Sequence, residues 1–518
     1  MTSPSDKLAE SLEALRKLQN EGVIAIQASD LSRTHRERLL KNGFLQAVMK
    51  GWYIPSRQDE TAGESTTWYA SFWDFCSAYL NKRFGNKWCF SPEQSLSLHA
   101  GNWTVPQQLL VRSPKGRNKV TSLPHKTSLF DAKYSIPSQK NEIELMNGLR
   151  VFSLRSALIA CSPRFFTQNP TDLRTVLALV RDASDILGLL LAGGHSTIAG
   201  RLAGAFRNIG RDKMADEIIK TMSAAGYDVR EADPFEQAPI IHLLNRERSP
   251  YVNRLTIMWQ QMRASVIEHF PAPPGRPANT KAYLKRVEEM YVTDAYHSLS
   301  IEGYRVSAEL IQRVRSGKWN PVNNEQDNKH TAALAARGYW QAFNAVESSL
   351  VKVLKGKNPG EVFDEDHRDW YREMFAPYIT AGILKPADLA GYRNSPVYIR
   401  RSMHVPPDSS AVRDLMPALC ELLSKETEAA VRVVLGHFFF VYIHPYMDGN
   451  GRMGRFLMNV ILAAHGYPWV VVPVEQRSKY MAALEEASVR QNIVPFSQFL
   501  ASLTTERLEG KELPKIKF

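Results

Sequence analysis

The apolar residues near the N-terminus first follow the period of a helix and then that of two short strands. The leucines from Leu8 to Leu18 lie three or four positions apart, which predicts an amphipathic helix. Ser29 or Asp30 is suited to cap a second helix, which we expect to end near Lys41. The alternation from Phe44 to Pro55 predicts two short strands joined by a tight turn.

Two helices followed by a β-ribbon form the outline of a winged helix-turn-helix, which we predict for residues 1–57. The second helix would present basic side chains to DNA phosphates and base edges. Its candidate DNA-binding residues are Arg33, His35, Arg36 and Arg38. The alternative is a small packing domain with a solvated basic face.

Residues 60–235 mix both periodicities, which predicts an α/β domain. Trp68–Phe84 has the pattern of a helix, whereas Gln107–Arg112 and Arg150–Phe152 have that of strands. The largely apolar stretch Asp172–Leu190 predicts one long helix.

From residue 250 to residue 505 the apolar positions follow the helical period almost throughout, which predicts an all-α domain. The expected helices are Thr280–Ser298, Ser307–Arg315, Asn328–Leu354, Asp364–Met374, Asp414–Ser424, Thr427–Ile443, Arg452–His465 and Ser478–Arg490. Gly391–His404 interrupts the pattern and predicts a short β-hairpin. The fold class is therefore mainly α, with the winged helix and the α/β domain first.

The composition of the chain limits what its partners, cysteines and location can be. Of 518 residues 44% are apolar, and 65 basic against 53 acidic residues leave a net charge of +12, which is compatible with a polyanionic partner without requiring one. The cysteines have no zinc-site or disulfide spacing, so we expect buried thiols in a reducing compartment. No signal peptide or membrane span is indicated, and a cytoplasmic protein is expected.

The residues best suited to a functional site come directly after the most apolar helical segment. Val433–Ile443 is apolar on nearly every face and is expected to be buried, and Pro445 prevents its simple continuation. Beyond it, Gly449 and Gly451 bracket an asparagine directly before the next expected helix. Successive amides at such a glycine-rich turn, together with a helix N-terminus, form a nest for a diphosphate.

Four side chains complete this pattern. Arg452 and Arg455 lie three apart, so both can hold phosphate oxygens. Asp448 is suited to hold Mg²⁺ against the same phosphates, and His444 to take a proton from an attacking hydroxyl. Each feature alone is more often structural, but a base, a metal ligand, an anion nest and an arginine clamp within twelve residues favour nucleotide chemistry.

His444–Arg455 resembles the Fic motif, HPFx[DE]GNGRxxR, and departs from it at Tyr446, which replaces a phenylalanine. The resemblance covers about residues 250–505 and implies a protein adenylyltransferase that moves AMP from ATP, with Mg²⁺, to a Ser, Thr or Tyr hydroxyl. It implies His444 as the catalytic residue and Asp448 as the metal ligand. The implied nucleotide-binding residues are Asp448, Gly449, Asn450, Gly451, Arg452, Met453, Gly454 and Arg455, with Tyr480 and Asn492 at the adenine.

Two further segments are similar to parts of Fic proteins. Gly391–Ile399 resembles the flap that pairs with an extended target segment. The implied target-docking residues are Pro396, Val397, Tyr398 and Ile399. Ser298–Gly303 resembles the inhibitory motif [ST]xxxE[GN], with Ser298, Glu302 and Gly303 at its defined positions; the resemblance implies that Glu302 pairs with Arg455 and blocks the γ-phosphate. An ordinary surface hairpin and a chance spacing are the alternatives.

The first 235 residues resemble AbiEi-type antitoxins, which combine a DNA-binding winged helix with an α/β domain. This resemblance supports a second hypothesis, a DNA-binding regulator that uses the Fic site as a nucleotide sensor; a toxin–antitoxin fusion would combine both. Among Fic chemistries, UMP or phosphocholine transfer and AMP removal stay open, whereas Doc-like kinases carry lysine in place of Gly451. A protein substrate at the flap is expected, and DNA binding and a homo-oligomer are open.

Overall fold

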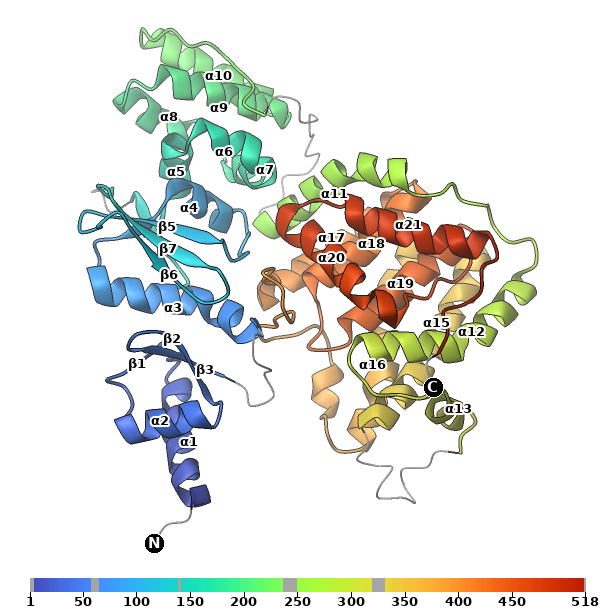
Figure 1. Ribbon diagram of the computed structural model, residues 1–518. Coiled ribbons are helices and arrows are strands. Elements are labelled where there is room, and N and C mark those ends of the chain that lie inside the picture. The colour runs from blue at the N-terminus through green and yellow to red at the C-terminus, as the bar shows by residue number, and fades with distance from the viewer. Residues whose placement is uncertain (1–3, 57–64, 138–140, 236–248, 319–330, 517–518) are drawn as a thin grey trace. The chain divides into compact units, whose positions relative to one another are not determined.

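The chain folds into two compact units in a computed structural model, which describes residues 4–56, 65–137, 141–235, 249–318 and 331–516 (Figure 1). The first unit comprises Met1–Arg254 and Tyr398–Val405. The second unit comprises Leu255–Val397 and Pro406–Phe518. Within the described ranges, no helix combines the length and the apolar character needed to span a bilayer.

The first unit begins with the two predicted helices and the two predicted strands, together with one short strand that was not predicted. They are α1 (Pro4–Asn20), β1 (Ile26–Gln27), α2 (Arg33–Lys41), β2 (Leu45–Met49) and β3 (Trp52–Pro55), with the antiparallel strand order β1-β3-β2. Helix α2 starts later than expected, because Ser32 caps it by accepting the N–H of His35, while Asp30 accepts the N–H of Gln27.

A mixed sheet follows, with a helix rich in aromatic residues. Its elements are α3 (Thr66–Phe84), β4 (Cys89–Phe90), β5 (Gln108–Ser113), β6 (Lys119–Ser122) and β7 (Ser128–Lys133), with strand order β4-β5-β7-β6. Strands β5 and β7 pair in parallel, while β8 (Ile143–Met146) and β9 (Leu149–Phe152) form a separate antiparallel pair. Rings of α3, among them Trp68 and Phe72, lie fully buried in the core of this region.

Helices complete the first unit. They are α4 (Pro92–His99), α5 (Leu154–Ala160), α6 (Pro163–Gln168), α7 (Pro170–Leu179), α8 (Ser184–Ala192), α9 (Ser196–Asn208) and α10 (Asp212–Ala224). The single helix predicted over Asp172–Leu190 is wrong, since α7 ends at Leu179 and a separate helix, α8, begins at Ser184. There the Asp185 carboxylate accepts the N–H groups of Arg181 and Asp182, which competes with helical hydrogen bonding.

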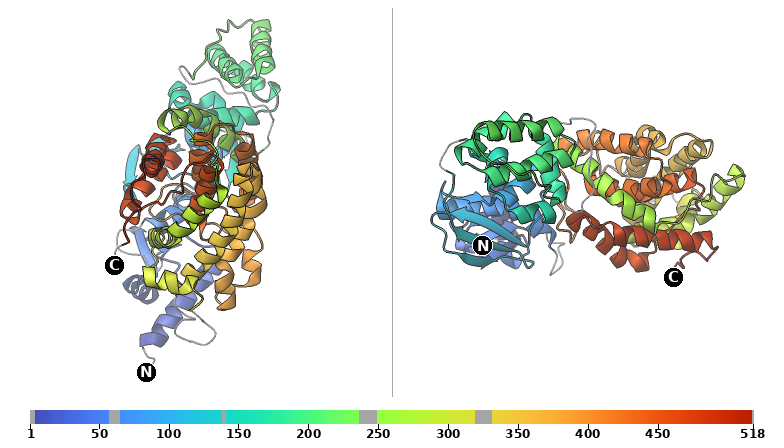
Figure 2. Two further views of the ribbon diagram at one scale, coloured as in Figure 1. Left: turned by 90° about the vertical axis from the view of Figure 1, so that its right-hand side faces the viewer. Right: turned by 90° about the horizontal axis from the view of Figure 1, so that it is seen from above.

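The second unit is helical, as predicted. Its helices are α11 (Pro250–His269, which starts in the first unit), α12 (Thr280–Ile301), α13 (Ala308–Arg315), α15 (Thr331–Leu354), α16 (Pro359–Thr380), α17 (Ser409–Lys425), α18 (Ala429–Ile443), α19 (Asn450–Ala464), α20 (Arg477–Arg490) and α21 (Val494–Leu508), with 3₁₀ turns η1 (Pro386–Leu389) and η2 (Val474–Gln476). The start of the helix predicted from Asn328 lies outside the described residues. Helix α19 packs on α15, α16 and α18 and is buried along nearly its whole length (Figure 1, Figure 2).

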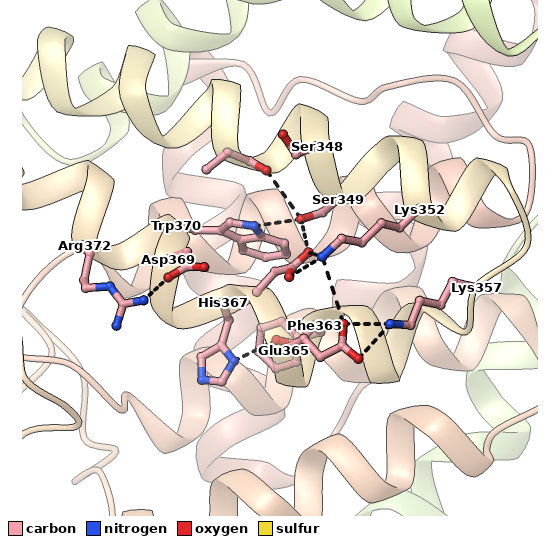
Figure 3. Close-up of polar contacts among 12 residues, drawn as sticks. Ser348, Ser349, Lys352, Lys357, Phe363, Glu365, His367, Asp369, Trp370 and Arg372 are labelled. Atoms are coloured by element: carbon pink, nitrogen blue, oxygen red, sulfur yellow. Dashed lines mark hydrogen bonds and ion pairs between the residues drawn. The ribbon is translucent and has the colours of Figure 1, made fainter.

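Helices α15 and α16 pack side by side and are joined by a polar cluster (Figure 3). Ser349 donates to Asp366 at 2.6 Å and accepts the indole N–H of Trp370 at 3.0 Å, while Lys352 Nζ lies 2.6 Å from Asp366. These bonds satisfy polar groups in a mostly apolar interface, and they fix the register of α16. Helix α16 can therefore present its other residues to the neighbouring loop at defined positions.

The hairpin predicted over Gly391–His404 is wrong, because no strand forms in this described segment. Proline at position 396 has no amide hydrogen for a ladder. Arg393 instead anchors the segment as an irregular loop by donating to the carbonyl oxygens of Ser395 and Pro407. In this loop the Arg393 side chain therefore provides hydrogen bonds to backbone carbonyl oxygens that strand pairing would otherwise satisfy.

Candidate active site

His444 ends the buried helix α18 in a left-handed conformation, with φ 53° and ψ 60°. That conformation is uncommon for a residue other than glycine and is typical of functional sites. His444 is partly buried, and its Nδ1 lies 3.1 Å from the carbonyl oxygen of Val441. This contact assigns the proton to Nδ1 and leaves the Nε2 lone pair available. Burial lowers the pKa of His444 to about 4, so the ring is neutral at pH 7.

The loop after His444 is held closed by Asn450. Its side-chain oxygen accepts the N–H of Tyr446 at 2.9 Å, and its amide nitrogen donates to the Tyr446 carbonyl at 2.8 Å. The Tyr446 ring stacks on Tyr371 of α16, with ring centroids 3.7 Å apart. Asn450 and the aromatic stack therefore fix the loop from its two sides.

Gly449 is the N-cap residue of α19 and lies in the left-handed region, with φ 81°. A Cβ at this position would lie 2.8 Å from the ring of Phe375, so both backbone angle and space require glycine. Asp448 Oδ1 accepts the Gly449 N–H at 2.6 Å, and the Asp448 side chain is largely exposed. The first turn of α19 follows directly, so its amides and the positive end of the helix face the loop.

Arg452 is fully buried between two rings. Its guanidinium lies 5.4 Å from the centroid of Tyr304 and 5.3 Å from that of Phe375. None of its three guanidinium nitrogens has a hydrogen-bond partner among the described residues, although Asp448 Oδ2 is 3.3 Å away. Burial alone would lower the pKa of Arg452, but the Asp448 carboxylate holds it above the usual value. A buried cation with unused donors is suited to an anionic ligand.

Arg455, one turn further, is already partnered. Its Nη2 lies 2.7 Å from Glu302 Oε1, and its Nε donates to the Ser298 hydroxyl at 2.9 Å. Its Nη2 also donates to the Ser298 carbonyl at 3.0 Å. Burial would lower the pKa of Arg455, but the Glu302 carboxylate raises it above its usual range. The pair of segments singled out in the sequence is therefore brought together as predicted.

Gly451 makes room for this carboxylate. A Cβ built on Gly451 would lie 2.4 Å from Glu302 Oε1, which is closer than real contacts allow. Glu302 is the residue that caps the C-terminus of α12, and Gly303 continues with φ 92°. The close approach of Glu302 to the loop therefore depends on the absence of a side chain at position 451.

The structure gives the surroundings of the remaining predicted nucleotide-binding residues but no direct indication of a nucleotide contact. Met453 is buried, and a Cβ at Gly454 would lie 3.0 Å from Val441, so both face the core. Tyr480 is buried with its hydroxyl 2.7 Å from His437 Nε2, whereas Asn492 is exposed and accepts the N–H of Val494. Nucleotide contacts by these four residues, Met453, Gly454, Tyr480 and Asn492, stay predictions.

Sequence reasoning missed the residues that hold the loop from outside it. The rings of Tyr304 and Phe375 cover Arg452. The side chain of Arg393 donates to the His444 carbonyl oxygen at 2.8 Å, and its backbone N–H donates to the Pro445 carbonyl oxygen at 2.9 Å. Tyr304 directly follows the Ser298–Gly303 motif, which is the signal that could have found it. Phe375 and Arg393 lie in segments without a local signal, because only the fold brings them to the loop.

The predicted flap residues differ in exposure. Pro396 is exposed and Val397 buried, both in the second unit. Tyr398 and Ile399 belong to the segment grouped with the first unit, where Tyr398 is 38% exposed. Target docking by these four residues stays a prediction.

The candidate DNA-binding residues of α2 mostly form contacts within their own domain. Arg36 donates to the carbonyl oxygens of Ala28 and Leu31, and Arg38 donates to the Ser11 hydroxyl. The ring of His35 lies 2.9 Å from that same hydroxyl. Arg33 is exposed and pairs with Glu37 at 2.7 Å. DNA binding stays a prediction.

Two further expectations concern metals and thiols. Among the described residues, no group of three or more His, Cys, Asp or Glu side chains is placed to hold a metal ion. Asp448 alone fits the Mg²⁺ role, since this ion commonly uses one or two carboxylates together with substrate phosphates. The thiols Cys76, Cys89, Cys161 and Cys420 are free and buried, as expected.

Comparisons with known proteins agree with this site. Residues 364–462 match the Fic/DOC family. The chain is 30% identical over 226 residues to a protein named "Protein adenylyltransferase Fic" from Drosophila willistoni, covering 43% of this chain and 42% of that protein. It is 29% identical over 273 residues to a protein of the same name from Nematostella vectensis, covering 52% and 59%. The chain thus spans about half the length of these relatives.

Among solved structures, the chain is similar to Fic-1 (residues 134–508) from C. elegans. The TM-score is 0.37 and the sequence identity 19%, with 63% of this chain and 91% of that chain covered.

Proposed function

This chain carries a Fic domain, and from that premise we propose that it transfers AMP from ATP to a hydroxyl group of a target protein. The observation that carries the proposal is the loop His444–Arg455, which holds both a neutral imidazole, whose Nε2 bonds to no described residue, and a buried guanidinium with unused donors. The proteins similar to this chain that are named "Protein adenylyltransferase Fic" support the same chemistry.

In the proposed step, the target hydroxyl loses its proton to His444 Nε2 and its oxygen attacks the α-phosphorus of ATP. A new O–P bond forms and the bond from the α-phosphorus to the bridging oxygen breaks, which releases pyrophosphate. Arg452 and the first amides of α19 stabilise the charge that develops on the phosphates. The left-handed turn at His444 keeps the imidazole at the loop mouth, so the residues mainly contribute positioning and electrostatics.

Mg²⁺ is the cofactor that fits this site. Asp448 would hold it together with the phosphates, because this carboxylate is exposed and lies next to the amides of the loop. The ion supplies neutralisation of phosphate charge when it is bound.

Restraint by Glu302 is part of the proposal. The Glu302–Arg455 pair occupies Nη2 of the guanidinium that a third phosphate would need, and Ser298 adds bonds to Nη2 and Nε of the same group. ATP could then bind only with its γ-phosphate displaced, and its α-phosphorus would be misaligned. Removal of the Glu302 carboxylate would free Arg455.

The target is proposed to dock along the loop that carries Pro396 and Val397. Arg393 connects this loop to the His444 and Pro445 carbonyls, so a docked segment would lie near the imidazole. Without β-strands in the loop, pairing with an extended target would have to order it. A cytoplasmic location is part of the same proposal.

The test incubates the Glu302→Gly chain with a cell lysate and ATP labelled either at the α- or at the γ-phosphate. AMP transfer predicts label on target proteins from α-labelled ATP only, and a mass increase of one AMP on a Ser, Thr or Tyr side chain. Label from γ-labelled ATP would contradict AMP transfer and indicate phosphorylation. Parallel reactions with UTP and CDP-choline as donors test the other transfer chemistries.

A further inference from the structure

A cavity lies in the first unit, among its helices α6 and α9 and the segment that follows α10. Its volume is about 670 Å³, which is within the range of about 300–1,000 Å³ typical of small-molecule sites. Three arginines line it, Arg164 from α6, Arg201 from α9 and Arg230 from the segment after α10. They come from three separate stretches of sequence, so the fold alone brings them together.

These arginines form no ion pair in the described part of the chain, although Asp228 also lines the cavity. None of their side chains forms an ion pair or a hydrogen bond with a described residue, and the Nε of Arg201 is buried without a partner. Arg207, on the same helix as Arg201, pairs instead with Asp212, Asp216 and Glu231. These three acidic side chains therefore form ion pairs with Arg207 and not with the arginines that line the cavity.

Arg201 holds its position through an aromatic contact. Its guanidinium lies 5.5 Å from the ring centroid of Phe166, which is fully buried. Burial lowers the pKa of Arg201, so an anion in the cavity would favour its charged form. The lining carries three positive side chains and one negative one, Asp228, which leaves a net charge of +2.

The wall that carries Arg230 is fixed to α9. A Cβ at Gly200 would lie 1.9 Å from the Arg230 carbonyl oxygen, so the segment crosses the helix in direct backbone contact. Ala232 donates its N–H to the Gly200 carbonyl at 3.3 Å, and Asn208 donates to Asp233 at 2.8 Å. The cavity is thus built from anchored backbone, which is what a preformed site requires.

We propose that this cavity binds a phosphate-bearing small molecule of nucleotide size. Guanidinium groups present paired donors that match phosphate oxygens, and three of them converging on one cavity suit a doubly charged phosphate. The hydroxyls of Ser196 and Thr197, which also line the cavity, provide further donors. A nucleic-acid strand is the less favoured ligand, since the arginines meet at one hollow and do not follow an open face. The proposal is independent of the Fic site.

Calorimetric titration of the full-length chain tests it. The chain carries Arg452→Ala, which removes the buried guanidinium proposed to bind phosphate at the Fic loop, and the probes are AMP, adenosine and a single-stranded oligonucleotide. AMP is expected to bind, and Arg164→Gln and Arg201→Gln are each expected to weaken its binding about tenfold or more, because each removes a charge-assisted hydrogen bond. Arg117→Gln, which removes an exposed arginine elsewhere in the first unit, is the matched control and should leave binding unchanged.

Arg164 is exposed on a surface helix, so its replacement leaves the core intact and keeps the test valid even if the Arg201 variant does not fold. The proposal is overturned if AMP does not bind, if adenosine binds as tightly as AMP, or if Arg117→Gln weakens binding as much as Arg164→Gln. Binding of the oligonucleotide without AMP would likewise overturn it.

Discussion

Helix α2 in the first unit and helix α19 in the second both carry arginines near their beginning, and the structure uses them in opposite ways. On α2, Arg36 donates to two backbone carbonyls and lies 5.6 Å from the ring centroid of Tyr53. On α19, Arg452 is buried at least as deeply but donates to no described residue. A basic helix in the sequence is therefore weak evidence for a ligand, whereas a buried cation with unused donors is strong evidence.

The same contrast separates Arg452 from Arg455 within one helix turn. Arg455 donates through Nε and Nη2 to Ser298 and Glu302. Arg452 lies between two rings with Asp448 as its nearest carboxylate, and it donates no hydrogen bond to a described residue. One arginine is thus ready for a phosphate and the other is occupied by a carboxylate from α12. Under the proposed function, Arg452 would contact the phosphates of bound ATP, whereas Arg455 would become available only after Glu302 releases it.

The largest expected effect is on His444. His444→Ala should lower AMP transfer by about 10²–10⁴-fold, because the general base is lost, while the arginines and the loop amides keep their places. Steady-state labelling with α-labelled ATP measures the transfer, and calorimetry measures ATP affinity. Transfer at the wild-type rate, or ATP affinity that falls in parallel with the rate, would contradict a role confined to proton transfer.

The next effect concerns the Glu302–Arg455 pair. Glu302→Gly should raise the transfer rate by about 10- to 100-fold, since a charge-assisted hydrogen bond is worth roughly 1.5–3 kcal/mol. Glu302→Gln is the matched control, which keeps the shape but weakens the bond, and it should give an intermediate rate. An unchanged rate in both variants would remove the restraint from the mechanism.

Gly451 provides an independent check on that pair. In Gly451→Ala the added methyl would displace the Glu302 carboxylate, whereas in a Glu302→Gly background its nearest neighbour would be Arg455 Nη1, at 3.2 Å. The two substitutions should therefore be non-additive in the Arg455-dependent affinity for ATP, measured by calorimetry across the four combinations. Additive effects would mean that Glu302 does not occupy the observed position in solution.

The pH dependence should follow from the depressed pKa of His444. A base with a pKa near 4 stays neutral down to about pH 5, so kcat/KM should not fall near pH 6.5 as it would for an ordinary histidine. The unfolded chain takes up this proton near pH 6.5, so the free energy of unfolding should decrease as the pH falls from about 6.5 toward 4. Denaturant unfolding at each pH separates the two effects; an activity loss centred near pH 6.5 with full stability would contradict the prediction.

The smallest effects are expected on α2, where they test the other side of the comparison. Arg36→Ala should reduce the free energy of unfolding by about 1 kcal/mol, because two carbonyls lose their donor. Arg33→Ala should leave the melting temperature unchanged, since its pair with Glu37 is exposed. If α2 binds DNA, a gel shift with the full-length chain should weaken on Arg33→Ala, because this side chain is exposed. A shift that Arg33→Ala leaves unchanged would contradict DNA contact by Arg33.

Much of the helical unit and its central loop could be predicted from local sequence. The apolar run of α18, the proline that ends it and the glycine-rich turn before α19 each act over a few residues, so their consequences are visible in the chain. The pairing of Ser298 and Glu302 with Arg455 could be expected only through family resemblance. The hairpin over Gly391–His404 and the single helix over Asp172–Leu190 were wrong, because Arg393 and Asp185 supply side-chain hydrogen bonds that periodicity does not reveal.

The sequence alone determined which residues could do chemistry: a histidine at the end of a buried helix, two arginines one turn apart and a glycine on each side of Asn450. Only the tertiary structure decided which of these groups are still available. The rings of Tyr304 and Phe375 and the carboxylate of Glu302 reach the loop from distant segments, and the fold brings together Arg164, Arg201 and Arg230. The reason is physical: hydrogen-bond satisfaction and burial depend on neighbours in space, which adjacent positions in the chain do not specify.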